Sequence, residues 1–215
     1  MAADGTTDAI DTEWFGTPAF LKESDPIEDL SNPTDDSLDK VLQAGKLIVG
    51  LDDSLPPMGY RDSETGEIVG YDISLAEEVC KRLGVTMVLQ PIDWNAKEGE
   101  LAAGRIDCVW NGMTVTPQRA EEMALLRPYL ANRQVMIVPE GSSIKTKAGL
   151  AGKKLGLQTG SSAVDALNSF PDAKASLAEV VEYGENLTAF LDLKIGRIDV
   201  LLVDEVVGRY LISHE

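Results

Sequence analysis

The sequence predicts an α/β protein in which short strands alternate with helices and form largely parallel sheets. From Lys46 onward, short apolar runs alternate with stretches of helical periodicity, the pattern of βαβ units. The tetrapeptide Gly-Arg-Ile-Asp occurs twice, at 104–107 and 196–199, each time between a helical stretch and an apolar run. Hydrophobic residues make up 44% of the 215 positions, enough for a packed core.

In the first half of the chain, Lys46–Leu51 is the first expected strand. Apolar residues three and four positions apart predict a helix over Asp72–Leu83, and Gly84 is placed to end it. Three further elements are expected there: a strand over Val85–Leu89, a helix over Lys97–Ala103 and a strand over Ile106–Trp110.

The second half repeats the alternation. The expected strands are Lys154–Leu157, Val180–Tyr183 and Ile198–Val203, and the expected helices are Ala163–Phe170 and Leu187–Ile195. The repeated tetrapeptide then has two interpretations. It is either a favourable helix-to-strand turn used twice, or the mark of two similar α/β lobes with this turn at equivalent places.

Residues 1–37 differ in composition from the rest of the chain. They contain ten acidic residues and one lysine, with prolines at 18, 26 and 33, which favours an acidic tether over a folded unit. Trp14, Phe15, Phe20 and Leu21 support the alternative that this stretch docks as a short helix. The expected organisation is therefore a tether over 1–37, a first lobe over 38–130 and a second lobe over 131–215.

Charge and composition exclude several classes of function. The net charge of −17 disfavours nucleic acid and anionic membrane surfaces as partners. No apolar run approaches the roughly 20 residues that span a bilayer. His214 is the only histidine, so neither a metal site nor a cofactor is expected. Cys80 and Cys108 lie in apolar patterns and favour free buried thiols, with a disulfide as the alternative.

Polar residues follow the predicted strands at the ends where α/β sheets bind ligands. After the first Gly-Arg-Ile-Asp strand come Asn111, Gly112 and Thr114, and then a helix start in which Thr116 precedes Pro117. Arg119 in the first turn of that helix is suited to hold a carboxylate.

Two further strand ends carry suitable groups. The run Gln158-Thr159-Gly160-Ser161-Ser162 leads into a helix and could hold an anion, although it is not a P-loop. Asp204 follows the second Gly-Arg-Ile-Asp strand and could face an ammonium group. Together these groups suit a small zwitterion.

These residues resemble the extracellular solute-binding proteins, family 3, in particular the amino-acid-binding members that serve ABC importers. The resemblance covers about Leu38 to Glu215. It is carried by six motifs in this order: GYDISLAEEV (70–79), GRID leading into WNGMT (104–114), TPQR (116–119), RPYL (127–130), GKKLGLQTGS (152–161) and DVLLVD (199–204). One small departure is Ser74, where the family usually has an acidic residue.

The resemblance implies a type II periplasmic-binding-protein fold, in which two Rossmann-like lobes close on a ligand and hinge strands cross near 129–133. It implies that Arg119 holds the α-carboxylate, assisted by Thr114, and that Asp204 receives the α-ammonium. The other residues implied to bind the ligand, including those of the side-chain pocket, are Asp52, Leu55, Trp94, Asn111, Gly112, Gln158, Thr159, Ser161 and Ser162. Asp52 and Trp94 favour a polar or basic amino acid.

The resemblance also implies a location outside the cytoplasm, in the periplasm or at the cell surface with or without a lipid anchor, and a membrane permease as partner. Members of the family continue for several dozen residues beyond the position of Glu215, so we expect a fragment or a first lobe without its return segment. Two alternatives remain: a dehydratase on the same fold, with Glu98 or Glu100 as general acid, and the sensor domain of a receptor.

Overall fold

A computed structural model describes residues 1–22 and 36–214. The chain divides into two compact units, whose main boundary falls between Ala131 and Asn132. Unit 1 contains Met1–Asp53, Pro57–Ile92 and Ala96–Ala131. Unit 2 contains Asn132–Glu215 together with the short segments Ser54–Pro56 and Asp93–Asn95.

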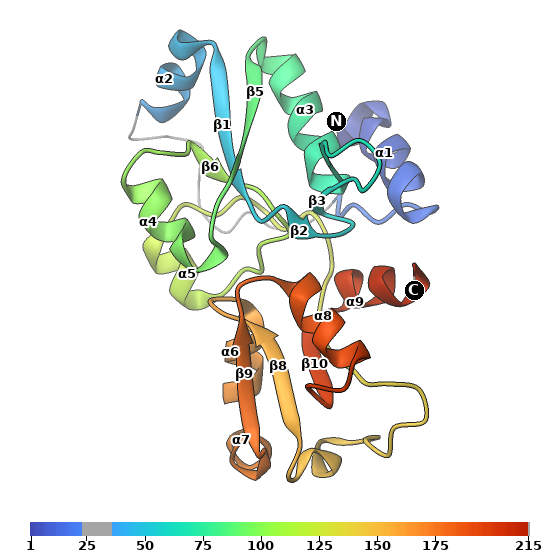
Figure 1. The fold of residues 1–215 in the computed structure, drawn as a ribbon. Coiled ribbons are helices and arrows are strands. Elements are labelled where there is room, and N and C mark those ends of the chain that lie inside the picture. Colours follow the sequence, from blue (N-terminus) through green and yellow to red (C-terminus); the bar gives the residue numbers. More distant parts are fainter. Residues whose placement is uncertain (23–35, 215) are drawn as a thin grey trace. The chain divides into compact units, whose positions relative to one another are not determined.

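Unit 1 is built on a parallel sheet in the order β5-β1-β6 (Figure 1). Its strands are β1 (Lys46–Leu51), β5 (Thr86–Pro91) and β6 (Cys108–Val109). A separate antiparallel hairpin is formed by β3 (Gly59–Arg61) and β4 (Ile68–Val69). Its helices are α1 (Thr6–Phe15), α2 (Ser37–Ala44), α3 (Tyr71–Leu83), α4 (Lys97–Ala102) and α5 (Pro117–Glu122), with a short 3-10 helix η1 (Ala2–Asp4).

Unit 2 has a four-stranded sheet in the order β7-β10-β8-β9, parallel except for β7. Its strands are β7 (Gln134–Ile137), β8 (Lys154–Gln158), β9 (Glu179–Tyr183) and β10 (Val200–Asp204), and the two-residue β2 (Ser54–Leu55) groups with this unit. The helices are α6 (Ser162–Asn168), α7 (Pro171–Ser176), α8 (Asn186–Lys194) and α9 (Glu205–Ser213), with 3-10 turns η2 (Trp94–Ala96) and η3 (Lys147–Leu150).

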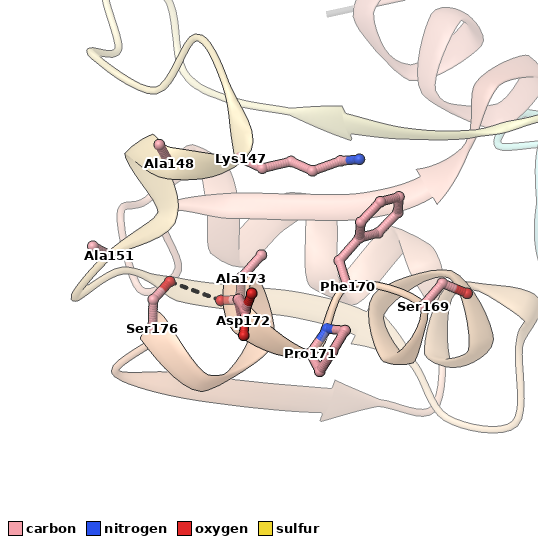
Figure 2. Close-up of a pocket in the computed structure, with 9 residues that line it drawn as sticks. All are labelled: Lys147, Ala148, Ala151, Ser169, Phe170, Pro171, Asp172, Ala173 and Ser176. Carbon is pink, nitrogen blue, oxygen red and sulfur yellow. Dashed lines mark hydrogen bonds between the residues drawn. The ribbon is translucent and has the colours of Figure 1, made fainter.

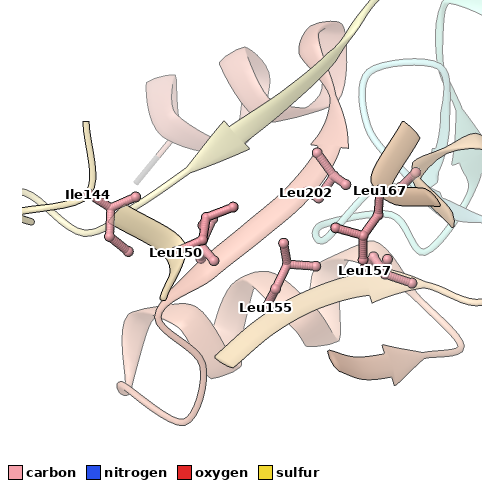
Figure 3. Close-up of a cluster of buried hydrophobic side chains, with 8 residues drawn as sticks. Ile144, Leu150, Leu155, Leu157, Leu167 and Leu202 are labelled. Atoms are coloured by element: carbon pink, nitrogen blue, oxygen red, sulfur yellow. The ribbon is translucent and has the colours of Figure 1, made fainter. Parts of the chain in front are cut away.

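The core of unit 2 lies between its sheet and α6. Leu155, Leu157, Leu167 and Leu202 are buried there against Ile144 and Leu150 (Figure 3). Because side chains alternate along a strand, the intervening residues of β8 and β10 face the other side of the sheet, where α8 packs on both strands. The expected alternation of strands and helices is confirmed by these elements.

The repeated tetrapeptide makes the same turn in both units. In unit 1, the backbone N–H of Ile48 donates to Asp107 Oδ2 at 2.7 Å; in unit 2, that of Lys154 donates to Asp199 Oδ2 at 2.8 Å. Each aspartate thus ties the entry of one strand to its neighbour. The glycines that begin the repeats have φ of +65° and +75°, a region that glycine adopts without strain.

The isoleucine of each repeat occupies an equivalent place as well. Ile106 and Ile198 are both 2% exposed. A Cβ added at Gly50 of β1 would lie 2.5 Å from Ile106 Cδ1, and one added at Gly156 of β8 would lie 2.5 Å from Ile198 Cδ1. Of the two interpretations of the repeat, the match in hydrogen bonds and packing favours two similar α/β lobes. The alternative was a favourable turn that is used twice.

The N-terminal segment is folded, so the expected tether does not hold for residues 1–22. Helix α1 packs against α3, and Asp11 is fully buried there. Asp11 Oδ1 accepts from the Tyr71 hydroxyl at 2.8 Å, and Oδ2 accepts from the backbone N–H groups of Ala19 and Phe20 at 2.6 and 2.8 Å. The rest of the expected tether, residues 23–35, lies outside the described residues.

Aromatic side chains explain why this acidic segment docks. Phe15 packs against Tyr71 with ring centroids 4.7 Å apart, and Phe20 stacks on Tyr129 at 6.3 Å. The indole N–H of Trp14 donates to Ser74 Oγ at 3.0 Å, so the residue that departs from the family pattern has a local partner. The apolar contacts and the buried carboxylate outweigh the acidic composition on which the tether was predicted.

We predict that Asp11→Asn destabilises the protein by about 2 kcal/mol, because a carboxylate that accepts three hydrogen bonds is replaced by an amide with one acceptor oxygen. Denaturant unfolding measures the change. Glu13→Gln is the matched control, since Glu13 is an exposed acid on the same helix. Equal stability of the two variants would contradict the role given to Asp11.

Candidate functional site

The carboxyl ends of β1 and β6 bring two predicted site residues of unit 1 together. Asp52, directly after β1, is 5% exposed, and Asn111, after β6, is 1% exposed. The backbone N–H of Asp52 donates to Asn111 Oδ1 at 3.2 Å, while Asn111 Nδ2 is buried without a hydrogen-bond partner. The pairing follows from parallel neighbours whose ends meet at one edge of the sheet.

Gly112 follows Asn111 and needs to be glycine. Its φ is +58°, and a Cβ added there would lie 3.3 Å from Met58 Cγ and 3.8 Å from Asp72 Oδ2. Asp72 itself is fully buried in α3 and accepts from the Tyr129 hydroxyl at 2.7 Å. Burial raises the pKa of Asp72 to about 7, although the hydrogen bond from Tyr129 acts in the opposite direction. This carboxyl supports the turn that carries Gly112.

Arg119 is held in a defined orientation within unit 1. Thr116 caps helix α5, its hydroxyl accepting from the backbone N–H of Arg119 at 3.2 Å, and Pro117 is the first helical residue, as expected. The guanidinium donates through Nη1 to the Thr114 carbonyl oxygen at 2.7 Å. Arg119 is only 7% exposed, so a permanent positive charge is kept almost out of water.

Asp204 lies at the end of β10 in unit 2 and is oriented by two side-chain amides. Its Oδ1 accepts from Gln134 Nε2 at 2.7 Å and from Asn132 Nδ2. Gln134 Nε2 also donates to Ser162 Oγ at 2.9 Å, and Gln134 Oε1 is buried without a hydrogen-bond partner. These two donors are neutral amides, and they fix the position of the carboxylate. Asp204 makes no capping bond to α9.

Two predicted site residues of unit 2 have roles within the unit. Both polar atoms of the Gln158 amide make hydrogen bonds: Nε2 donates to the Gly184 carbonyl at 2.9 Å, and Oε1 accepts from Asn186 Nδ2 at 2.8 Å. Ser161 is the N-cap of α6, and its hydroxyl donates to the Gln158 carbonyl at 2.7 Å. These contacts shape the turn after β8, in which the backbone N–H of Thr159 donates to the Tyr183 carbonyl.

Leu55 and Trp94 lie in the two short segments that group with unit 2. Each is 6% exposed. A Cβ added at Gly160 would lie 2.8 Å from Asn95 Oδ1, so the residue after Trp94 approaches the turn that follows β8 closely. The absence of a side chain at Gly160 allows that approach.

A cavity of about 440 Å³ in unit 2 contains none of the predicted residues (Figure 2). It is lined by η3 and α7, and Lys147 Nζ lies 3.0 Å from the centroid of the Phe170 ring. The Ser176 hydroxyl is turned back to the Ala173 carbonyl at 2.8 Å. The arrangement is an exposed cation–π contact on the surface of the unit, without a converging set of polar groups.

Sequence reasoning did not single out three buried or partly buried polar residues near the predicted ones. Gln134 lies in a strand that the hydrophobic pattern did not predict. Asp72 was read as part of a helix start. Lys97 was predicted only as the first residue of a helix, yet it is 2% exposed and its Nζ lies 2.9 Å from Glu98 Oε1. A lysine in a polar helical stretch gives no signal of burial.

Three further findings concern the cysteines, membrane-spanning helices and metal sites. Cys80 and Cys108 are free, and burial raises the pKa of the Cys108 thiol to about 12. Within residues 1–22 and 36–214, no helix has the length and apolar character needed to cross a membrane. The same residues contain no group of three histidine, cysteine or acidic side chains placed to hold a metal ion.

The comparisons with known proteins define the family. The sequence profile of the bacterial extracellular solute-binding proteins, family 3, matches residues 47–201, so the chain belongs to this family. Its α/β fold is the type II periplasmic-binding-protein fold, as predicted.

Several relatives are similar over most of this chain. The L-cystine-binding protein TcyJ of Escherichia coli is 31% identical over 178 residues, which are 82% of this chain and 65% of that protein. An ABC-transporter substrate-binding protein from Streptococcus pneumoniae, solved with bound histidine, is 36% identical with a TM-score of 0.80, over 85% of this chain and 75% of that one. Holo ArgBP from T. maritima is 31% identical with a TM-score of 0.75, over 82% and 76%.

We predict that the Asp72→Asn variant gains stability relative to the wild type as pH rises from about 4 to about 7. In this window the folded wild type keeps a proton that the unfolded chain, with an ordinary aspartate pKa, has released, so its stability falls with pH. The difference should grow by up to about 1.4 kcal/mol per pH unit. Urea unfolding at several pH values measures it. A constant difference would show that Asp72 is ionised normally in the fold.

Proposed function

We propose that this chain is the amino-acid-binding component of an ABC importer and captures a free L-amino acid outside the cytoplasm. The chain spans about 65% of the length of the curated relative TcyJ, and the proposal concerns the activity of the whole protein. Family membership supports it, as do relatives named for binding cystine, histidine and arginine. The relatives named periplasmic support the location.

The observation that carries the proposal is the buried guanidinium of Arg119. A permanent cation that is 7% exposed and donates to a carbonyl oxygen is stabilised further when an anion joins it. An α-carboxylate matches the fork of the guanidinium, which can donate two parallel hydrogen bonds. Thr114, whose carbonyl orients Arg119, is in place to assist.

Asp204 of unit 2 is proposed to receive the α-ammonium group. Its carboxylate is oriented by Gln134 and Asn132, and a carboxylate is the partner that a cationic group requires. The buried Gln134 Oε1, without a partner, is an acceptor suited to a second ammonium hydrogen. Ser162, joined to the same amide, completes the group. The two units thus supply opposite charges for the opposite charges of one zwitterion.

The side-chain pocket is assigned to Asp52, Leu55 and Trp94, together with Asn111 and Gly112. Trp94 offers an aromatic face and Leu55 an apolar wall, while Asp52 and Asn111 supply polar atoms. This combination suits a polar side chain. Gln158, Thr159 and Ser161 contribute by shaping the turn after β8.

Delivery to a membrane permease is the proposed use of binding. A ligand that contacts both units favours whichever conformation of the chain allows both sets of contacts, and a permease can recognise that conformation. The ligand needs no covalent change in this scheme, so the proposed activity is capture and release.

A thermal-shift screen of the twenty amino acids tests the proposal. A ligand that binds the folded state alone stabilises it by about 2.7 kcal/mol at a hundredfold excess over its dissociation constant, which raises the melting temperature by several degrees. We expect such a shift with at least one L-amino acid and none with its D-enantiomer. A flat response to all twenty would contradict amino-acid binding.

We predict that Arg119→Ala weakens binding of that amino acid by about 3 kcal/mol, roughly a hundredfold, because the carboxylate loses its charged partner. Isothermal titration calorimetry measures the loss. Arg105→Ala is the matched control: Arg105 is exposed and paired with Glu100 within unit 1. Unchanged affinity in Arg119→Ala would remove Arg119 from the site.

A further inference from the structure

The hydroxyl of Tyr129 reaches a carboxyl group in the interior of unit 1. Tyr129 Oη donates to Asp72 Oδ1 at 2.7 Å, and Asp72 is fully buried. Burial and the neighbouring Asp72 carboxyl raise the pKa of Tyr129, so the hydroxyl keeps its proton and remains a donor. Removal of this donor would take a hydrogen bond from a buried carboxyl, which is costly in the interior of a protein.

The same carboxyl lies close to the turn that carries predicted site residues. A Cβ added at Gly112 would lie 3.8 Å from Asp72 Oδ2, so the backbone of the turn packs beside the carboxyl. Asn111 precedes Gly112 in this turn and Thr114 follows it. Because protein interiors are close-packed, a change in the position of the carboxyl is transmitted to this backbone.

Tyr129 is itself held by several contacts within unit 1. Its ring stacks on those of Phe20 and Tyr71, with the centroids 6.3 Å apart in each pair. Its carbonyl oxygen accepts from the backbone N–H of Leu21 at 2.8 Å. The main boundary between the units falls two residues further along the chain, after Ala131. Tyr129 thus joins the N-terminal segment, helix α3 and the chain that leads into unit 2.

We propose that Tyr129 is a positioning residue for amino-acid binding: its hydroxyl holds Asp72 in place, and Asp72 holds the turn that contains Gly112. The inference rests on the proposed function and adds a residue that acts through Asp72 rather than on the amino acid itself. Phenylalanine would keep both ring stacks, so the packing of the ring does not account for the hydroxyl. A substitution that removes the hydroxyl alone therefore separates positioning from packing.

Tyr129→Phe is the substitution that tests the inference in the full chain. We expect it to weaken amino-acid binding by about tenfold, measured by isothermal titration calorimetry. The probes are L-cystine, L-histidine and L-arginine, for which relatives are named. Any other amino acid that raises the melting temperature of the wild type is added to them.

Tyr71→Phe is the matched control. It removes a hydroxyl that also donates to a fully buried carboxylate of unit 1, Asp11 Oδ1 at 2.8 Å, and it keeps the ring. Asp11 belongs to α1 and not to the turn that contains Gly112. Denaturant unfolding should therefore show a comparable loss of stability in both variants, whereas affinity should fall in Tyr129→Phe alone.

Two variants of Asp72 test the acceptor of the same hydrogen bond. Asp72→Asn keeps an oxygen that can accept from the Tyr129 hydroxyl, whereas Asp72→Leu is similar in size and has no acceptor. We expect Asp72→Asn to bind the probes at least about fivefold more tightly than Asp72→Leu does. This comparison decides the question if Tyr129→Phe does not fold.

The outcomes separate this inference from the proposed function. Equal affinities of the wild type and Tyr129→Phe overturn the inference and leave the proposed function standing. An equal loss of affinity in Tyr71→Phe also overturns it, because the loss would then follow from destabilisation of unit 1. Equal binding by the two Asp72 variants overturns it as well. A wild type that binds no amino acid overturns both.

Discussion

A guanidinium kept almost out of water is the constraint on which this account depends. Arg119 is 7% exposed, is fixed by the Thr114 carbonyl and has its helix start capped by Thr116. Burial of a cation costs free energy that an anion can offset. In the proposed site, Asn111 and Gly112 shape the turn that precedes Arg119 in the chain.

Both units fix the entries of their strands with the same set of contacts. An aspartate at the entry of a strand, Asp107 or Asp199, fixes the neighbouring strand by a side-chain hydrogen bond, and an isoleucine fills the space over a glycine. With the strand entries fixed in this way, the residues that follow the strands, such as Asn111 and Asp204, are held in defined places. The repeat in the sequence is thus a repeat in the construction of the two units.

Hydrophobic patterning was enough to predict the alternation of strands and helices, since buried strands and amphipathic helices leave a periodic record. Contacts between residues far apart in the chain leave no periodic pattern in the sequence. Asp11 meets Tyr71 sixty positions away, so an acidic segment that reads as a tether is in fact docked. Gln158 was predicted from the turn that contains it, but its partners at Gly184 and Asn186 come from another loop. Lys97 lies in a stretch whose polar composition is typical of a surface helix, yet it is as buried as a core residue.

The most direct test is a thermodynamic cycle that combines one change in the ligand with one change in the protein. The amino acid that stabilises the fold and its methyl ester, which keeps the α-ammonium group but has no carboxylate charge, are titrated into the wild type and into Arg119→Ala. The account predicts that the two changes are coupled by about 2 kcal/mol, because each removes one partner of the same charged contact. Changes that add to within about 0.5 kcal/mol would show that the carboxylate and Arg119 do not meet.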